Sequence, residues 1–435
     1  MLTFLGFAMV VAFMYLIMSK RLSALIALIL VPIIFALFGG FGPTIGPMML
    51  AGITKLAPTG VMLMFAILYF ALMIDSGLFD PAVRKILQWV KGDPMKVSVG
   101  TAVLALVVSL DGDGATTYMI CVAAMLPLYS RIGMSPRIMA GLIILAGGIM
   151  NMTPWGGPTA RAASALHVDA SDIFVPMIPA MCAGVFALLL IAYFYGKRER
   201  ARLGELHLHG DEADHSEISV SQFPDARRPK LIWFNGALTL VLMIALIMGL
   251  LPLPVLFMIA FSIAMIINYP NLQDQKDRIA AHSGSVLAVV GLIFAAGIFT
   301  GILTGTGMVD AMSKSLLAVI PEAMGPYLAV ITALVSMPFT FFMSNDAFYY
   351  GVLPVLTEAA AHYGISPVEM ARASIVGQPV HLLSPLVPST YLLVALAGIE
   401  FGDHQRFTLK WAVLVCLCIM VAALLMGIFP LYSSL

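Results

Sequence analysis

Apolar runs of about 20 residues follow one another along almost the whole chain of 435 residues. At 1.5 Å per residue, about 20 residues of α-helix span the roughly 30 Å hydrocarbon core of a bilayer. Only 11% of the residues are charged, whereas soluble domains carry roughly 25%. The pattern predicts an all-α polytopic membrane protein. The sequence has no basic patch with interleaved aromatic residues, so we expect no nucleic-acid partner.

One long stretch, residues 196–230, is hydrophilic: GKRERARLGELHLHGDEADHSEISVSQFPDARRPK. Its polar composition is typical of a solvated linker. It divides the chain into two halves of similar length, 1–195 and 231–435. We therefore predict two membrane-embedded domains joined by this linker.

The two halves carry related motifs in the same order. SGLFD at Ser76 returns as TGMVD at Thr306, and GMSP at Gly133 returns as GISP at Gly364. Later matches pair Thr153-Pro154 with Ser384-Pro385, and Asp111–Asp113 with Ser344–Asp346. The offsets are 230, 231, 231 and 233 residues. Four matches at nearly one offset indicate an internal duplication.

The basic residues predict the orientation of the two repeats. We assign five full spans and one re-entrant hairpin to each half. Of the 23 Lys and Arg residues, all but Lys55, Arg161, Lys314 and Arg372 then fall on the side of the linker. The positive-inside rule predicts a cytoplasmic linker and both termini outside. Because five is odd, the second half enters the membrane inverted, which is a transporter architecture.

The re-entrant hairpins are predicted at about 97–129 and about 326–363. The apolar segments on either side of SLDGDGATTY contain only about 14 residues each, too few to cross the hydrocarbon core. Basic residues flank both ends of the first pair: Lys91, Lys96, Arg131 and Arg137. Both tips, SLDGDGATTY and MSNDAFYYG, are therefore expected near the middle of the membrane.

Carboxylates at that depth are candidate functional groups. An acid near the centre of a bilayer costs at least ~2.5–3.5 kcal/mol on insertion scales. We predict that Asp111, Asp113 and Asp346 hold a metal ion or a proton, with Gly112 allowing the sharp turn. Ser344 and Asn345 are predicted substrate ligands beside Asp346. The alternative is that Asp111 only caps the helix that follows it.

Each half also contains a predicted broken helix, at about 137–166 and about 369–400. In NMTPWGGPTARAA and LLSPLVPSTYLL, two prolines three or four residues apart interrupt the backbone hydrogen bonds. Free carbonyls and a half-helix N-terminus would then face a cavity. Nearby polar side chains are predicted substrate ligands: Asn151, Thr153, Thr159, Ser384, Ser389 and Thr390. The alternative is that these breaks are packing kinks whose hydroxyl groups bond back to the helix.

Two further polar residues have two interpretations each. Arg161 is either a clamp for a substrate carboxylate or an arginine on the external surface. His381 lies one turn before Ser384-Pro385 and could carry a proton, although a lone histidine more often hydrogen-bonds between packed helices.

The start MLTFLGFAMVVAFMYLIMSKRLSALIALILVPIIFAL, both tips (SLDGDGATTY and MSNDAFYYGVLP) and NMTPWGGPTARAA resemble the metal–citrate:proton symporters. These are bacterial secondary transporters of the ion transporter superfamily, and the resemblance covers essentially the whole chain. It implies a scaffold domain and a mobile transport domain, an elevator mechanism, a homodimer and a location in the inner membrane. The implied substrate is citrate complexed with a divalent cation such as Mg²⁺ or Ca²⁺, taken up with protons, with no permanently bound cofactor.

The acids at the tips agree with such a cargo. Free citrate carries about three negative charges, whereas its complex with a divalent cation retains about one and can bridge to protein carboxylates. Related sodium-coupled dicarboxylate carriers have Ser-Asn-Thr at both tips, so the aspartates here argue against sodium coupling. Alternatives are a proton- or sodium-coupled carrier of another di- or tricarboxylate without metal, and a cation/proton antiporter. No Ser/His/Asp or HExxH arrangement occurs, so we do not expect an enzyme.

Overall fold

The computed structural model describes residues 1–435 except 91, 113, 204–222, 319–320 and 434–435, and describes only the backbone of residues 18, 111 and 224. In the part that it describes, the chain is helical and contains no β-strand. Long apolar stretches form helices in a membrane because an α-helix satisfies its own backbone N–H and C=O groups, which water cannot reach there.

The helices of the first half are α1 (Leu2–Met18), α2 (Ala24–Phe38), α3 (Ile45–Asp75), α4 (Asp80–Val90), α5 (Pro94–Val108), α6 (Gly114–Ile132), α7 (Pro136–Met150), α8 (Gly157–Leu166) and α9 (Ala170–Leu203). Those of the second half are α10 (Ile232–Ile247), α11 (Leu253–Asn268), α12 (Leu272–Gly305), α13 (Met308–Leu317), α14 (Leu328–Phe342), α15 (Leu353–Ala361), α16 (Pro367–Ser374), α17 (Gln378–His381), α18 (Pro388–Leu396) and α19 (Phe401–Leu425). The order of the helices is similar in both halves, but the interrupted helix has two pieces in the first half, α7 and α8, and three in the second, α16, α17 and α18.

Seven helical segments in the described part of the chain are long and apolar enough to cross a membrane. They contain α3, α6, α9, α10, α12, α14 and α19. Five shorter apolar helices (α1, α2, α5, α7 and α11) accompany them. The structure therefore agrees with the prediction of an all-α protein built from apolar helices.

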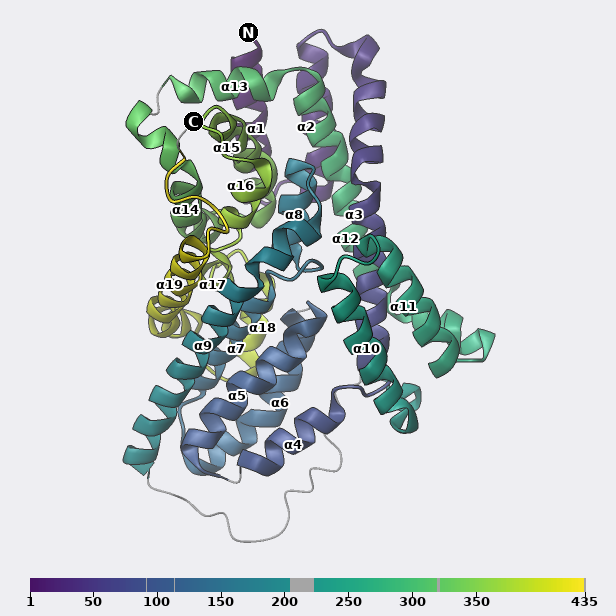
Figure 1. The fold of residues 1–435 in the computed structure, drawn as a ribbon, viewed down its shortest axis with the longest axis vertical. Helices are drawn as coiled ribbons and strands as arrows, with labels where there is room; N and C mark the ends of the chain where they lie inside the picture. The colour runs from purple at the N-terminus through teal and green to yellow at the C-terminus, as the bar shows by residue number, and fades with distance from the viewer. Residues whose placement is uncertain (91, 113, 204–222, 319–320, 434–435) are drawn as a thin grey trace.

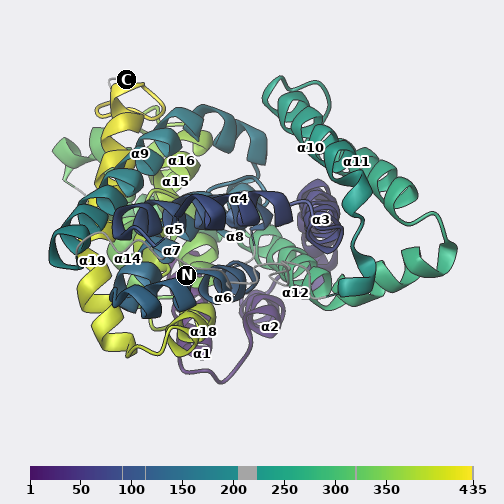
Figure 2. The ribbon, with the colours of Figure 1, turned by 90° about the horizontal axis from the view of Figure 1, so that it is seen from below.

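The longest helix pair forms a wall through the molecule, which we call the α3–α12 wall. Glycines allow the two helices to touch through their backbones: a β-carbon on Gly52 would lie 1.9 Å from the carbonyl oxygen of Gly297. Helix α2 packs on α12, and α11 packs on α3. Seen from below, α10 and α11 extend away from the rest of the molecule (Figure 2).

The other helices, α5–α9 and α14–α19, form a second unit that we call the hairpin body (Figure 1). Within it, α5, α7 and α19 pack on α9, and α14 packs on α16 and α17. Both chain termini lie at one end of the molecule, and α9 ends at the other (Figure 1). The short helices α4 and α13 lie across opposite ends.

Candidate functional site

The first hairpin turns at a glycine in the left-handed region. After α5, one turn of 3₁₀-helix over Ser109–Asp111 leads to Gly112, whose φ is +76°. A side chain there would be strained, and its β-carbon would lie 3.1 Å from Trp155 Cδ1. The Trp155 indole N–H donates to the carbonyl oxygen of Leu110 at 2.9 Å. Trp155 thus fixes the tip. Asp113 and the Asp111 side chain lie outside the described residues, so their predicted roles stay predictions.

The second hairpin turns between Phe342 and a stretch of π-helix over Ala347–Val352. The Ser344 hydroxyl accepts a hydrogen bond from the backbone N–H of Ala347 at 3.2 Å. The Asn345 Oδ1 atom is buried and has no hydrogen-bond partner among the described residues. π-Helical turns are rare and occur frequently at functional sites.

An ion pair joins this second tip to the first half of the chain. Arg161 Nε on α8 donates to Asp346 Oδ1 at 2.6 Å, and the two side chains are 22% and 16% exposed. One helical turn further along, the Ser164 and Tyr350 hydroxyl groups lie 3.0 Å apart. The structure therefore brings Arg161 and Asp346 together and does not place Arg161 on the external surface.

The helices are interrupted between Met150 and Gly157 and between His381 and Pro388. In the first, the Thr159 hydroxyl donates to the Met152 carbonyl at 3.0 Å, and in the second, Thr390 donates to the Leu382 carbonyl. These two hydroxyl groups thus bond back to the interrupted backbone, as the packing alternative proposes. The Thr153 hydroxyl differs: it is buried without a hydrogen-bond partner in the described part of the chain.

The second interruption is tied to the end of α14. His381 Nδ1 donates to the Thr340 carbonyl, and the Ser384 hydroxyl donates to the Phe341 carbonyl, both at 2.6 Å. Ser389 reaches the first hairpin, because a β-carbon on Gly114 would lie 3.5 Å from Ser389 Oγ. In this geometry His381 serves helix packing through Nδ1.

The two interrupted helices also contact each other directly. The Asn151 amide donates to Gln378 Oε1 at 3.2 Å, and the Gln378 amide donates to the Tyr349 hydroxyl at 3.0 Å. Helix α7 approaches α17 so closely that a β-carbon on Gly148 would lie 2.5 Å from Pro379 Cα. Asn151 of the first half therefore contacts the interrupted helix of the second half, in a polar core that the two halves share.

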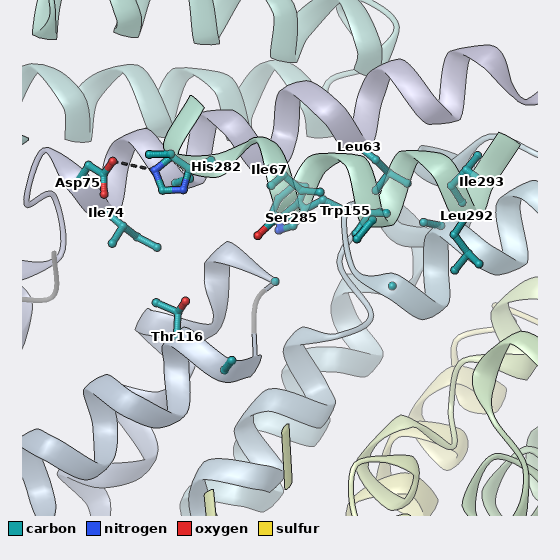
Figure 3. A pocket seen from close by; sticks show the side chains of 18 of the residues that line it. Leu63, Ile67, Ile74, Asp75, Thr116, Trp155, His282, Ser285, Leu292 and Ile293 are labelled. Carbon is teal, nitrogen blue, oxygen red and sulfur yellow. Dashed lines mark hydrogen bonds and ion pairs between the residues drawn. The ribbon is translucent and has the colours of Figure 1, made fainter. Parts of the chain in front are cut away.

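A cavity of about 590 Å³ separates this core from the α3–α12 wall (Figure 3). Of the predicted site residues, Gly112 and Arg161 line it, and Asp346 lies behind Arg161. The wall contributes mostly apolar side chains, including Leu63, Ile67 and Leu292. Arg161 thus connects the cavity to the predicted acidic site.

Asp75, Trp155 and His282 are among the lining residues that the sequence analysis did not include in the site. Asp75 is 2% exposed and accepts hydrogen bonds from His282 Nε2 at 2.8 Å and from Arg278 Nη1 at 3.1 Å. An ionisable residue at the end of a long apolar run is the signal that could have found Asp75. His282 follows a polar stretch, residues 272–278, and offers no such signal.

No group of three or more His, Cys, Asp or Glu residues that could hold a metal ion occurs in the part of the chain that the structure describes. The oxygen atoms available near the interruptions and the second tip come instead from single residues: Asp346, Asn345 and Thr153. A divalent cation would need further ligands, and a substrate that brings its own carboxylates supplies them.

Comparison with known proteins gives close relatives. A family model described as citrate transporter matches residues 13–377. Two Bacillus subtilis (strain 168) proteins align over 428 residues, which is 98% of this chain and 99% of each relative. One, named citrate transporter, is 62% identical, and the other, named Mg(2+)/citrate complex secondary transporter, is 58% identical. Both are named as transporters.

Two solved transporter structures share the fold at 16% identity. The Alcanivorax borkumensis YdaH transporter has a TM-score of 0.55, with 88% of each chain covered. The Neisseria gonorrhoeae MtrF structure, described within a class of antimetabolite efflux pumps, has a TM-score of 0.61, with 89% of this chain and 84% of that chain covered. At this identity the likeness concerns the fold alone.

Proposed function

Since the chain belongs to the citrate transporter family, we propose that it imports citrate as a complex with a divalent cation, Mg²⁺ or Ca²⁺, together with protons. It is a membrane protein with apolar helices, and we place it in the bacterial inner membrane. The relative named Mg(2+)/citrate complex secondary transporter supports the metal complex as cargo.

The observation that carries this proposal is the ion pair between Arg161 and Asp346 at the edge of the cavity. A guanidinium binds carboxylates through a planar fork of donors, whereas a carboxylate binds divalent cations. A metal–citrate complex presents both a carboxylate and a cation. It can therefore replace each partner of the pair with a group of the same sign, so neither buried charge is left unpaired.

Two buried oxygen atoms, one at the second tip and one at the first helix interruption, suit a hard cation. Asn345 Oδ1 and Thr153 Oγ1 are buried without hydrogen-bond partners among the described residues, and an orphaned oxygen is costly unless a ligand satisfies it. Oxygen ligands favour Mg²⁺ or Ca²⁺ over softer ions. We assign the cation to Asp346 and the residues of the first tip. An aspartate that does not hold metal would carry the driving proton, with Asp111 and Asp113 as candidates and His381 as a further one.

The architecture that we propose is a pair of inverted repeats, 1–195 and 231–435, with re-entrant hairpins at α5–α6 and α14–α15. Such repeats would be related by a two-fold axis, which exchanges corresponding contacts. The contact of Gly147 with Leu382 and that of Asn151 with Gln378 exchange under a shift of 231 residues, and Gly148 meets its own counterpart, Pro379. This pattern supports a two-fold relation between the halves, and the corresponding helices α4 and α13, which lie across opposite ends of the molecule (Figure 1), support the inverted one.

We further propose an elevator motion in which the hairpin body moves along the α3–α12 wall. The linker would be cytoplasmic and both termini outside, because the termini and the end of α9 lie at opposite ends of the molecule (Figure 1). Helices α10 and α11 carry exposed apolar side chains such as Trp233 and Leu240. Lipid or the second subunit of a homodimer would cover them.

Uptake of labelled citrate into proteoliposomes under an inward proton gradient tests the function. We expect uptake to require both the gradient and Mg²⁺ or Ca²⁺. Asp346→Asn should reduce uptake at limiting metal by at least about tenfold, since a charge-assisted contact contributes roughly 1.5–3 kcal/mol. The control is Asp403→Asn, because that acid is 55% exposed, is 4.0 Å from Arg137 and does not line the cavity.

Two results would contradict the proposal in different ways. Uptake that needs the gradient but is indifferent to metal would identify a carrier of free di- or tricarboxylates, in which Arg161 alone binds the anion. Absence of citrate uptake from wild-type vesicles that hold a proton gradient would reject citrate as the substrate.

A further inference from the structure

The α3–α12 wall ends, near the start of α4, in a charged cluster that the proposed transport site does not use. The cluster consists of Asp75, Arg278 and His282, and Asp75 and His282 line the cavity (Figure 3). The lining residues of α12 continue from His282 to Ile293, which is about 16 Å of helix. The wall therefore has a polar end, whereas Leu63, Leu292 and Ile293 make its opposite end apolar.

The geometry of the cluster orients the imidazole of His282. Its Nε2 atom lies 2.8 Å from Asp75 Oδ2, and that same oxygen accepts a hydrogen bond from Arg278 Nη1 at 3.1 Å. No partner for the His282 Nδ1 atom is found among the described residues. Figure 3 shows the ring with Asp75 on one side and the cavity on the other. The free ring nitrogen is therefore available to a molecule in the cavity.

Helix packing alone does not require these charges. Under the shift of 230 residues that relates Ser76 to Thr306, Asp75 corresponds to Gly305, while Arg278 and His282 correspond to Met48 and Gly52. At that far end the helices pack tightly without charged groups: a β-carbon on Gly305 would lie 2.7 Å from Met48 Cγ. The charged cluster is thus a feature of one end only.

The protonation of His282 changes the net charge at this end of the cavity. Arg278 already balances Asp75, so an imidazolium adds one positive charge. Two ion pairs lie nearby: Arg227 with Asp80, and Arg228 with Asp274 at 3.8 Å. The ring of Phe223 packs over the Arg278 guanidinium at 4.5 Å and against the imidazole at 6.0 Å, and it contributes no charge.

Another titratable group nearby, Tyr269, stays neutral. Burial, and secondarily the charge of Asp75, raises the pKa of Tyr269 to about 12. Its hydroxyl donates to the Ala226 carbonyl at 2.7 Å. Histidine, in contrast, is the side chain that commonly changes charge between about pH 5 and pH 8.

We infer that His282 is a second anion-binding residue of the cavity, which binds a carboxylate of the cargo through Nδ1 when protonated, with Asp75 as its positioning residue. The inference rests on the proposed transport of an anionic citrate complex. Binding at this end strengthens as pH falls and weakens as the imidazole loses its proton. Ser285, one turn along the same wall, offers a hydroxyl group to the same anion.

Calorimetric titration of the purified full-length protein with Mg²⁺–citrate tests this inference at about pH 6 and about pH 7.5, two values within the range in which histidine side chains commonly change charge. Variants are compared at one pH, because the protonation of citrate itself is then common to all of them. We expect His282→Gln to bind about 3–10 times more weakly than wild type at the lower pH and within about twofold at the higher pH.

Two further variants keep the test informative if His282→Gln also disturbs packing. His282→Lys carries a permanent charge and should bind tightly at both pH values, which a purely structural role would not produce. Asp75→Asn should reduce the difference in Mg²⁺–citrate affinity between the two pH values, relative to wild type. Ser283→Ala is the matched control, because Ser283 is exposed on the same helix, its hydroxyl bonds to the Ala280 carbonyl, and it is not among the residues that line the cavity.

The outcomes separate this inference from the proposed function. If wild type binds Mg²⁺–citrate and His282→Gln matches it at both pH values, the inference is wrong and the proposed function stands. If wild type binds neither Mg²⁺–citrate nor citrate alone, the proposed function fails and the inference fails with it.

Discussion

At the scale of single residues, Arg161 and Asp346 neutralise each other's charge. Removing one partner of a buried pair leaves an uncompensated charge, while removing both does not. We expect Arg161→Gln and Asp346→Asn each to cost about 1–3 kcal/mol, below the roughly 3–5 kcal/mol of a fully buried pair, because both side chains retain some exposure. The double variant should regain most of that stability.

Thermal unfolding in detergent and citrate uptake, measured on the same four proteins, separate folding from binding. Uptake should stay lost in the double variant although its melting temperature recovers. A double variant that transports like wild type would show that the pair serves structure alone.

The role of Arg161 illustrates what the sequence cannot provide at this scale. Its position after a helix interruption left two interpretations open, a substrate clamp and a surface residue. Its partner Asp346 lies 185 positions away in the chain. Likewise, Asp75 and His282 are separated by 207 positions. Such pairings depend on which helices pack against each other, and the local patterns of a single sequence do not tell which helices do so.

At the scale of elements, the first hairpin depends on the left-handed backbone of Gly112. We expect Gly112→Ala to cost about 1–2 kcal/mol for the positive φ, with an additional cost because the new β-carbon meets Trp155 at 3.1 Å. The displaced tip should lower citrate uptake by more than the loss of folded protein accounts for. Uptake per folded molecule and melting temperature are the measurements.

Gly40 provides the control for backbone strain. Its φ is +81°, and a β-carbon there would meet nothing within 4 Å. Gly40→Ala should therefore lower the melting temperature through strain alone and leave uptake per folded molecule unchanged. Equal loss of uptake in both alanine variants would contradict a specific role for the Gly112 tip.

The all-α class of the elements could be predicted because apolar runs are local signals. A run of about 20 apolar residues needs only its own composition to favour a spanning helix. Proline is a weaker signal: it removes a backbone donor, yet α3 continues through Pro58, and α9 continues through Pro176 and Pro179. The packing of the interruptions is different. Thr159 bonds to the Met152 carbonyl, and Trp155 bonds to the Leu110 carbonyl. These bonds depend on the path of the backbone through the turn, which the residue types alone do not specify.

At the scale of the whole molecule, the proposed motion requires the hairpin body to move past the α3–α12 wall. The two units touch at an aromatic contact, where the rings of Phe70 on α3 and Trp155 have centroids 4.8 Å apart. Trp155 also contacts Phe174 of α9, within the hairpin body, at 6.5 Å. Trp155 thus has an aromatic neighbour in each unit. A cysteine at this position can therefore be cross-linked either to the wall or within the hairpin body.

The test uses the double variant Phe70→Cys and Trp155→Cys, in a chain whose four native cysteines are replaced by alanine. A cleavable cross-link between the two new cysteines should lower citrate uptake by at least roughly tenfold, because it prevents rigid-body displacement of the hairpin body relative to the wall. Reduction of the cross-link should restore uptake to the level of the same variant before cross-linking. The pair Trp155→Cys and Phe174→Cys joins two parts of one moving unit, so the same reagent should leave its uptake within about twofold. If the first pair transports while cross-linked, the hairpin body does not need to leave the wall. The cargo would then have to pass between Arg161 and the cluster of Asp75 and His282 through local rearrangement of the tips alone.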